Sequence, residues 1–122
     1  MTNLLLELYK TLKKSDEFDV FFVGQHNGEI RRPTVVIVPG STVPQLGVRT
    51  LGVQKVTLEV MTGLNSYLEM EKTIKSVKDF IRNNTIKRDL RKTGYESAIY
   101  IHDKKQAYCK DLEYTILREL RK

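Results

Sequence analysis

Residues 34–60 read TVVIVPGSTVPQLGVRTLGVQKVTLEV, with the apolar runs TVVIV (34–38) and VTLEV (56–60) on either side of a long connection. β-Branched residues dominate both runs, as they do in strands buried in a sheet. The connection, residues 39–52, is much longer than the usual hairpin loop of about two to five residues. Long connections inside small domains are usually functional, so this stretch bears on both the fold and the function.

The glycines of the connection first suggest a phosphate-binding loop. Such a loop has the pattern G-x-x-x-x-G-K-[ST] between a strand and a helix, so that backbone N–H groups face the anion. Gly40 and Gly47 are too far apart for that pattern, no Lys-Ser or Lys-Thr pair follows, and the next predicted element is a strand. The sequence therefore argues against phosphate binding here.

Two interpretations of the connection remain open: a loop packed on its own domain, or an arm that contacts another molecule. Its apolar side chains could be buried in either case, and Pro44 stiffens the chain because its φ angle is fixed. On the second interpretation, the predicted assembly contacts are Val43, Pro44, Gln45, Leu46, Val48, Arg49 and Leu51.

Upstream of residue 34, the sequence predicts a helix and a hairpin. Asn3 can cap a short amphipathic helix whose leucines recur at helical spacing. Residues 18–23, FDVFFV, predict a strand, and a glycine-containing turn follows at residues 24–28. Residues 29–32 then predict the return strand of a hairpin.

Downstream of the connection, the apolar positions of the predicted strand change side. Leu51 and Val53 occupy odd positions, whereas the apolar residues of segment 56–60 occupy even ones. Because side chains alternate between the two faces of a strand, this change predicts a β-bulge or bend near Gln54 and Lys55.

The clearest predicted helix covers residues 66–83. Ser66 and Glu69 form a capping box, and apolar side chains then recur at helical spacing along one stripe. Glu71 and Lys75 form a predicted i,i+4 ion pair on the polar side.

Three segments complete the predicted fold. Residues 85–96 have no clear period and predict a basic loop or a short irregular helix, residues 97–102 predict a strand, and alternation over residues 108–116 predicts a long final strand. The whole chain, residues 1–122, thus predicts one α+β domain in which two amphipathic helices pack on one face of a largely antiparallel sheet with a long hairpin loop.

Composition agrees with a small globular protein. The chain has 122 residues, of which 40% are hydrophobic, and a single cysteine, so no internal disulfide can form. No apolar run approaches the roughly 20 residues of a membrane-spanning helix, and the start of the chain lacks the pattern of a secretory signal. We therefore expect a cytoplasmic protein.

No residue pattern indicates catalysis, a cofactor or a metal. His26, His102 and Cys109 lack the spacing that brings metal ligands onto one face. Cys109 lies in an alternating strand pattern, and no nucleophile elbow is present. The carboxylates of Glu69 and Asp79 fit a solvated helix face better than an acid–base pair. We therefore expect no catalytic residues, no cofactor and no metal.

The chain is basic, with a net charge of +6, and most of the excess lies in its second half. The residues concerned are Arg82, Lys87, Arg88, Arg91 and Lys92. A basic segment can bind nucleic acid by releasing phosphate counterions, but it also suits an acidic protein partner or a solvated surface. A small nucleic-acid-binding domain is the alternative function that this charge suggests.

The order of segments along nearly the full chain resembles a known family. RRPTVVIVPGS, a long loop, VQKVTLEVMTG, the capped helix SYLEMEKTIKSVKDFIRN and the final strand YCKDLEYTILREL are similar to the tail-terminator and tail-to-head joining (neck) proteins of long-tailed phages and phage-derived contractile particles.

The resemblance implies a structural virion assembly protein without catalytic residues. It implies a homo-oligomer, a hexameric ring that caps the tail tube and joins the tail to the head connector, with the tail tube protein and a head connector or neck protein as partners. DNA would pass through as cargo. The ring would assemble in the host cytoplasm and end in the neck of the virion or of a phage-tail-like particle. Residues 39–52 would be the arm between subunits, and the basic segment from Arg82 to Lys92 a possible connector or nucleic-acid contact.

Overall fold

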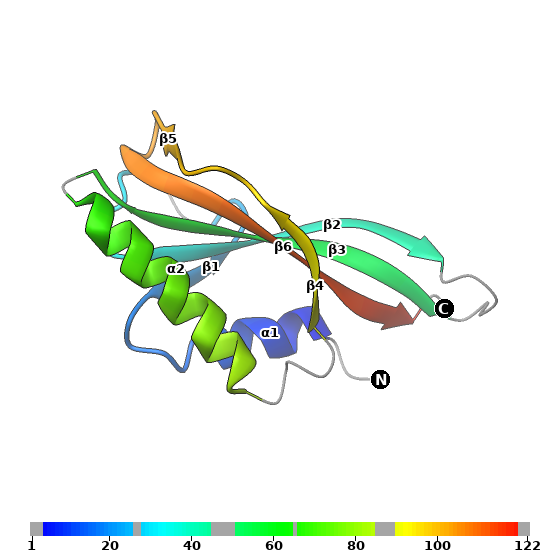
Figure 1. Cartoon of the computed structure of the whole chain (residues 1–122). Helices are drawn as coiled ribbons and strands as arrows, with labels where there is room; N and C mark the ends of the chain where they lie inside the picture. The colour runs from blue at the N-terminus through cyan, green and yellow to red at the C-terminus, as the bar shows by residue number, and fades with distance from the viewer. Residues whose placement is uncertain (1–3, 26–27, 45–50, 65, 85–89, 120–122) are drawn as a thin grey trace.

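The computed structural model describes residues 4–25, 28–44, 51–64, 66–84 and 90–119 (Figure 1). The prediction of an α+β fold is confirmed, with two helices and a mixed sheet of six strands. In chain order the elements are α1 (Leu4–Leu12), β1 (Asp19–Phe22), β2 (Thr34–Pro44), β3 (Leu51–Gly63), α2 (Tyr67–Arg82), β4 (Leu90–Glu96), β5 (Tyr100–His102) and β6 (Ala107–Glu119).

The sheet has the strand order β1-β2-β3-β6-β4, and β5 also pairs with β6. The two longest strands, β3 and β6, pair without interruption from Leu51 opposite Glu119 to Gly63 opposite Ala107. Strand β1 runs parallel to β2, and the other pairs are antiparallel. The centre of the sheet is therefore a long two-stranded ribbon that joins the middle of the chain to its last described strand.

The predicted hairpin of residues 18–23 with 29–32 is wrong. Residues 29–32 form no strand, and β1 pairs instead with β2. The backbone N–H of Ile30 donates to the carbonyl of Lys105 at 3.0 Å, and the Ile30 side chain is buried. These contacts hold Ile30 against the β5–β6 turn, whereas Arg32 lies beside β1 and forms an ion pair with Asp19 at 3.3 Å.

Both helices contribute to one core cluster with the sheet. Buried side chains of α1 (Leu8 and Leu12) and of α2 belong to the same cluster as alternate residues of β2, β3 and β6. The cluster's strand residues define the helix-side face of the sheet: Val35, Ile37, Val56, Leu58, Val60, Leu112, Tyr114 and Ile116. Within the described residues, no helix is long and apolar enough to cross a membrane.

Helix α2 begins and packs as its sequence pattern indicates. The Ser66 hydroxyl accepts a hydrogen bond from the backbone N–H of Glu69 at 3.2 Å, which satisfies one of the free donors of the first turn. The buried stripe consists of Met70, Thr73, Ile74, Val77 and Ile81. On the polar side the recorded i,i+4 ion pair is Lys75 with Asp79, at 3.0 Å, in place of the predicted pair with Glu71.

The opposite side of the sheet, the open face, carries only a small apolar cluster. Its buried members are Ile30, Val36, Met61, Ala107 and Cys109. Figure 1 shows α1 and α2 on the other side of the sheet. Among the described residues, neither helix covers the open face, and Ile30 packs on it from outside the sheet.

The predicted bulge exists, but it lies in β2 rather than in β3. Even-numbered residues of β3 stay on the helix-side face from Gly52 to Val60, whereas the β2–β3 register shifts between Pro39 and Thr42. Gly40 and Ser41 together oppose the single residue Lys55. A Cβ atom on Gly40 would lie 3.1 Å from the Lys55 carbonyl oxygen, so the close approach of the two strands favours glycine there.

The segment after α2 also differs from expectation. Residues 90–96 form β4 instead of a loop or irregular helix, and only Tyr100–His102 of the predicted strand 97–102 forms one. The Ser97 hydroxyl accepts a hydrogen bond from the Asp111 backbone N–H at 2.9 Å, so a side chain completes the ladder where the strand is interrupted. Residues 85–89 lie outside the described residues.

Candidate assembly surface

The long connection proves to be largely an extension of the sheet. Residues 39–44 belong to β2 and residues 51–52 to β3, so the prediction of a loop over 39–52 is wrong for these residues. The arm is defined here as residues 39–44 of β2, 51–55 of β3 and 116–119 of β6. Figure 1 shows these strand ends extending past α1 and α2.

The seven predicted assembly residues divide into two groups. Val43, Pro44 and Leu51 lie in the strands of the arm, opposite Val53, Gly52 and Glu119 respectively. Gln45, Leu46, Val48 and Arg49 lie outside the described residues. The structure therefore brings the first three together at the far end of the ribbon.

The arm is tied down at its base by Gln54. The Gln54 amide Nε2 donates to the Gly40 carbonyl oxygen at 3.0 Å, across the β2 bulge. Gln54 Oε1 is buried and has no hydrogen-bond partner within the described structure. A polar side chain thus occupies a helix-side position that the sequence pattern had assigned to the outside.

The outer edge of β2 is exposed beyond β1, which pairs only with residues 34–37. The Val23 backbone N–H donates to the Ile37 carbonyl at 3.0 Å, so Ile37 directs its backbone groups outward from the sheet. Backbone groups point to alternate sides along a strand, and Pro39 therefore points outward as well.

Pro44 shares this outward direction. Pro39, Thr42 and Pro44 oppose Val56, Gln54 and Gly52, which are alternate residues of β3 and hence equivalent in hydrogen-bonding direction. Proline has no N–H, so of these three positions only Thr42 offers a donor to an incoming strand. The β2 edge of the arm is thereby protected against pairing with another sheet.

The three described members of the predicted basic contact, Arg82, Arg91 and Lys92, are dispersed. Arg82 lies at the end of α2 and pairs with Asp79 at 2.6 Å. Arg91 and Lys92 are exposed neighbours in β4 and, by strand alternation, lie on opposite faces. Lys87 and Arg88 lie outside the described residues.

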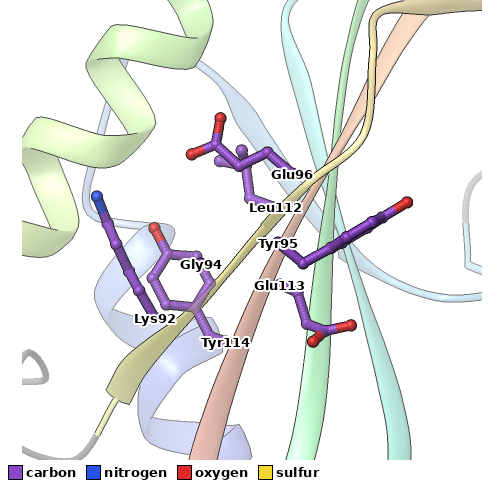
Figure 2. A pocket seen from close by; sticks show the side chains of 7 residues that line it. All are labelled: Lys92, Gly94, Tyr95, Glu96, Leu112, Glu113 and Tyr114. Carbon is purple, nitrogen blue, oxygen red and sulfur yellow. The ribbon is translucent and has the colours of Figure 1, made fainter.

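A shallow pocket lies where β4 separates from β6. Its lining residues are Lys92, Gly94, Tyr95, Glu96, Leu112, Glu113 and Tyr114 (Figure 2). Figure 2 shows Tyr95 and Glu113 on one side of β4, and Lys92 and Tyr114 on the other. The pocket holds no pairing of a nucleophile with a base, so its side chains suggest a gap in the strand pairing rather than a reaction site.

Glu96 links β4 to its neighbours. Its carboxylate lies 2.7 Å from Lys78 Nζ of α2 and 3.6 Å from Lys110 Nζ of β6. The hydrogen bond from Lys78, with the positive charges of both lysines, lowers the Glu96 pKa. These ion pairs explain how an exposed, irregular strand is held against the rest of the domain.

Cys109 is buried in β6 on the open face. Burial raises the pKa of its thiol to about 12, so the thiol stays protonated at neutral pH and is a poor nucleophile. Within the described residues, no group of three or more His, Cys, Asp or Glu side chains is arranged to hold a metal ion.

A second exposed surface, which the sequence reasoning missed, lies at the end of the sheet away from the arm. Ile101 opposes Tyr108, whose ring is 5.5 Å from that of Tyr67, and Leu64 and Leu68 flank Tyr67 in the chain. Leu68 is 72% exposed and Ile101 54% exposed. These five residues are the end cluster. The sequence signal for this surface was Leu68, a large apolar residue next to Tyr67 that does not fall on the apolar stripe of the helix.

Comparison with protein-family models and with curated proteins returns no match for the chain.

Proposed function

We propose that this protein is a structural assembly protein that forms a hexameric ring, caps the tail tube of a phage or phage-tail-like particle, and joins it to the head connector. The arm is the observation that carries the proposal. Strands β3 and β6 each have 13 residues, against about five or six in a typical strand, and they continue beyond the helices. A strand extension of this kind suits contact with a neighbouring subunit.

A closed ring needs two different surfaces on each subunit, because its contacts run head to tail. The arm and the end cluster provide two such surfaces at opposite ends of the β3–β6 ribbon. The prolines of β2 make simple edge-to-edge pairing of the arm unfavourable. The arm would therefore bind through side chains, and the exposed apolar residues of the end cluster are its proposed receptor on the next subunit.

In this proposal the protein performs no chemistry. It would recognise itself first, then the tail tube protein on one side of the ring and the head connector or neck protein on the other. DNA would pass only as cargo, and the ring would occupy the tail neck after assembly in the host cytoplasm.

The proposal is tested by asking whether the full chain forms rings. The chain is examined by sedimentation velocity and negative-stain electron microscopy, both alone and when co-expressed with a tube-forming protein encoded beside its gene. We expect discrete rings, free or at the ends of tubes of finite length. Tubes that remain unbounded in length and carry no added density at their ends would contradict the proposal.

The role of residues 45–50, which join the arm segments of β2 and β3 in the chain, is tested by replacing them with a Gly-Ser segment of equal length. The matched control replaces residues 103–106, the turn between β5 and β6, in the same way. We expect the first variant to stay folded by circular dichroism and to lose rings, and the control to retain them. Loss of folding in the arm variant would mean that the segment packs on its own core instead.

Leu68→Asp tests the proposed receptor, with the exposed residue Leu6 of α1 as control through Leu6→Asp. Only the end-cluster variant should lose rings. The alternative of a nucleic-acid-binding domain predicts a monomer that binds DNA with steep salt dependence, which fluorescence anisotropy over a salt series would detect. No specific observation favours that alternative, because the described basic residues are dispersed.

A further inference from the structure

The open face of the sheet separates its charges along the strands. Glu59 of β3 lies directly opposite Asp111 of β6, and Glu113 follows two residues further along β6 on the same face. Cross-strand partners and residues two apart share a face, so these three carboxylates form one surface, the acidic patch. All three side chains are only partly buried.

Two positive residues lie on the same face, one within the arm and one beside it. Lys55 of β3 and Arg91 of β4 both oppose Thr115 of β6, one from each side, and both are exposed. Lys55 precedes Glu59 by four residues, which corresponds to about 13 Å along the strand. We name Lys55 and Arg91 the basic pair. Within the described residues, neither takes part in a recorded salt bridge.

The acidic patch is unfavourable in the isolated chain. Like charges directly opposite each other across two strands destabilise a sheet. Burial, together with the charge of Asp111, raises the pKa of Glu59, and His102 and Lys105 only partly offset this. The Asp111 carboxylate also accepts a hydrogen bond from the Tyr100 hydroxyl at 3.0 Å. A positively charged partner would relieve the repulsion.

We infer that the open face binds the open face of a second copy of this chain, with the two sheets antiparallel. A two-fold axis between the sheets, level with Thr57, reverses the strand direction, so Lys55 of each copy meets Glu59 of the other and Arg91 lies near Asp111. Glu113, which is opposite Thr57, then lies beside the axis. Face-to-face packing of two sheets is a common arrangement, with about 10 Å between them. The contact is isologous and closes at two copies, so it is distinct from the proposed ring contact.

The chemistry of the face also limits the strength of the contact. On β3, Thr57 lies between Lys55 and Glu59, with half-buried Val38 opposite it on one side and Glu113 on the other. Exposed ion pairs contribute little individually and are screened by salt. We therefore expect a weak dimer in rapid exchange, which dissociates as the ionic strength rises.

Charge reversal tests the inference in the full chain. One variant, Lys55→Glu with Arg91→Glu, makes the face more acidic, and the other, Glu59→Lys with Glu113→Lys, makes it more basic. Sedimentation velocity at low salt should show dimers of the wild type, monomers of each variant alone, and heterodimers when the two variants are mixed. The control Lys10→Glu with Lys72→Glu makes the same net charge change on α1 and α2, and should dimerise as the wild type does.

The mixing step makes the test independent of any loss of stability, because a misfolded variant could not restore dimers. The inference is overturned if the protein that carries only the 45–50 replacement stays monomeric at low salt. It is also overturned if the mixture of the two charge-reversed variants, made in that background, fails to associate. That background removes the predicted assembly contacts Gln45, Leu46, Val48 and Arg49, on which the ring is expected to depend. If dimers persist in this background and the full chain forms no rings, the ring proposal is refuted and the two-fold contact is supported. If the full chain forms rings and this background forms no dimers, the two-fold contact is refuted and the ring proposal is supported.

Discussion

The amide nitrogen of Gln54 lies 3.0 Å from the carbonyl oxygen of Gly40, and this hydrogen bond joins β3 to the bulge of β2. Among the described residues, the Oε1 atom of the same side chain is buried and has no hydrogen-bond partner. A buried unsatisfied acceptor costs about 1–3 kcal/mol, whereas exposed Gly40 could bond to water if the amide were removed. Gln54 therefore fixes the geometry of the arm at some expense in stability.

Gln54→Met should raise the free energy of unfolding by up to about 1 kcal/mol, because it removes the unpaired acceptor at nearly constant volume. Amide hydrogen exchange in residues 40–44 should nevertheless become faster, since the bulge loses its tether. Urea denaturation measures the first effect and exchange mass spectrometry the second. A drop in stability of more than about 1 kcal/mol would show that the hydrogen bond outweighs the unpaired oxygen.

Glu59→Gln should stabilise the domain at neutral pH. The raised Glu59 pKa means that the folded state binds this proton more tightly than the unfolded state does. The stabilisation that protonated Glu59 provides is therefore fully present below its pKa in the unfolded state. It is lost as the pH rises through its pKa in the folded state. Urea denaturation at pH 8 should show the variant as the more stable protein, and the difference should shrink toward pH 4. Glu7→Gln, at an exposed position of α1, is the matched control for the loss of one negative charge.

The contribution of Glu96 to the free energy of unfolding should have the opposite pH dependence to that of Glu59. The Glu96 pKa is lowered by Lys78 and Lys110, so its contribution is present above the unfolded pKa and is lost as the pH falls through the folded one. Glu96→Gln should cost about 0.5–1 kcal/mol, because the Lys78–Glu96 pair is partly exposed and solvent weakens its attraction. A double-mutant cycle with Lys78→Met isolates the coupling, and hydrogen exchange in β4 should quicken in the variant. Zero coupling in that cycle would mean that other contacts hold β4.

Replacing both Pro39 and Pro44 with valine should expose the outer edge of β2 to strand pairing. The two substitutions restore the missing N–H donors and add β-branched side chains to an exposed edge. We expect concentration-dependent aggregation with increased thioflavin fluorescence. Thr42→Val, which adds apolar surface but no donor, serves as the control. Equal aggregation of the control would attribute the effect to hydrophobicity instead of edge pairing.

Local signals in the sequence predicted the parts of the fold that depend on local physics. The cap at Ser66 and the apolar stripe of α2 were both readable, because a helix satisfies its own backbone and shows its buried side every three or four residues. Alternation also identified β6, with Leu112, Tyr114 and Ile116 buried on one face.

Non-local pairings could not be read in the same way. The choice of β2 as the parallel partner of β1 depends on residues such as Ile30, which is held by Lys105. The position of the bulge was misjudged because the pattern treats glutamine as a surface residue, whereas Gln54 is buried and bonds to Gly40. Strand β4 is defined by ion pairs and by pairing with β6, neither of which its own composition reveals.

The place of β6 in the sheet has a consequence for folding during synthesis. This strand lies between β3 and β4 and also pairs with β5, yet the ribosome makes it after every other described element. Until it emerges, the nascent chain has β3 with one side unpaired and β4 and β5 without their partner, and such edges invite aggregation. Productive folding must therefore wait for β6, and a chaperone that shields the nascent β3 edge should increase the yield of native protein.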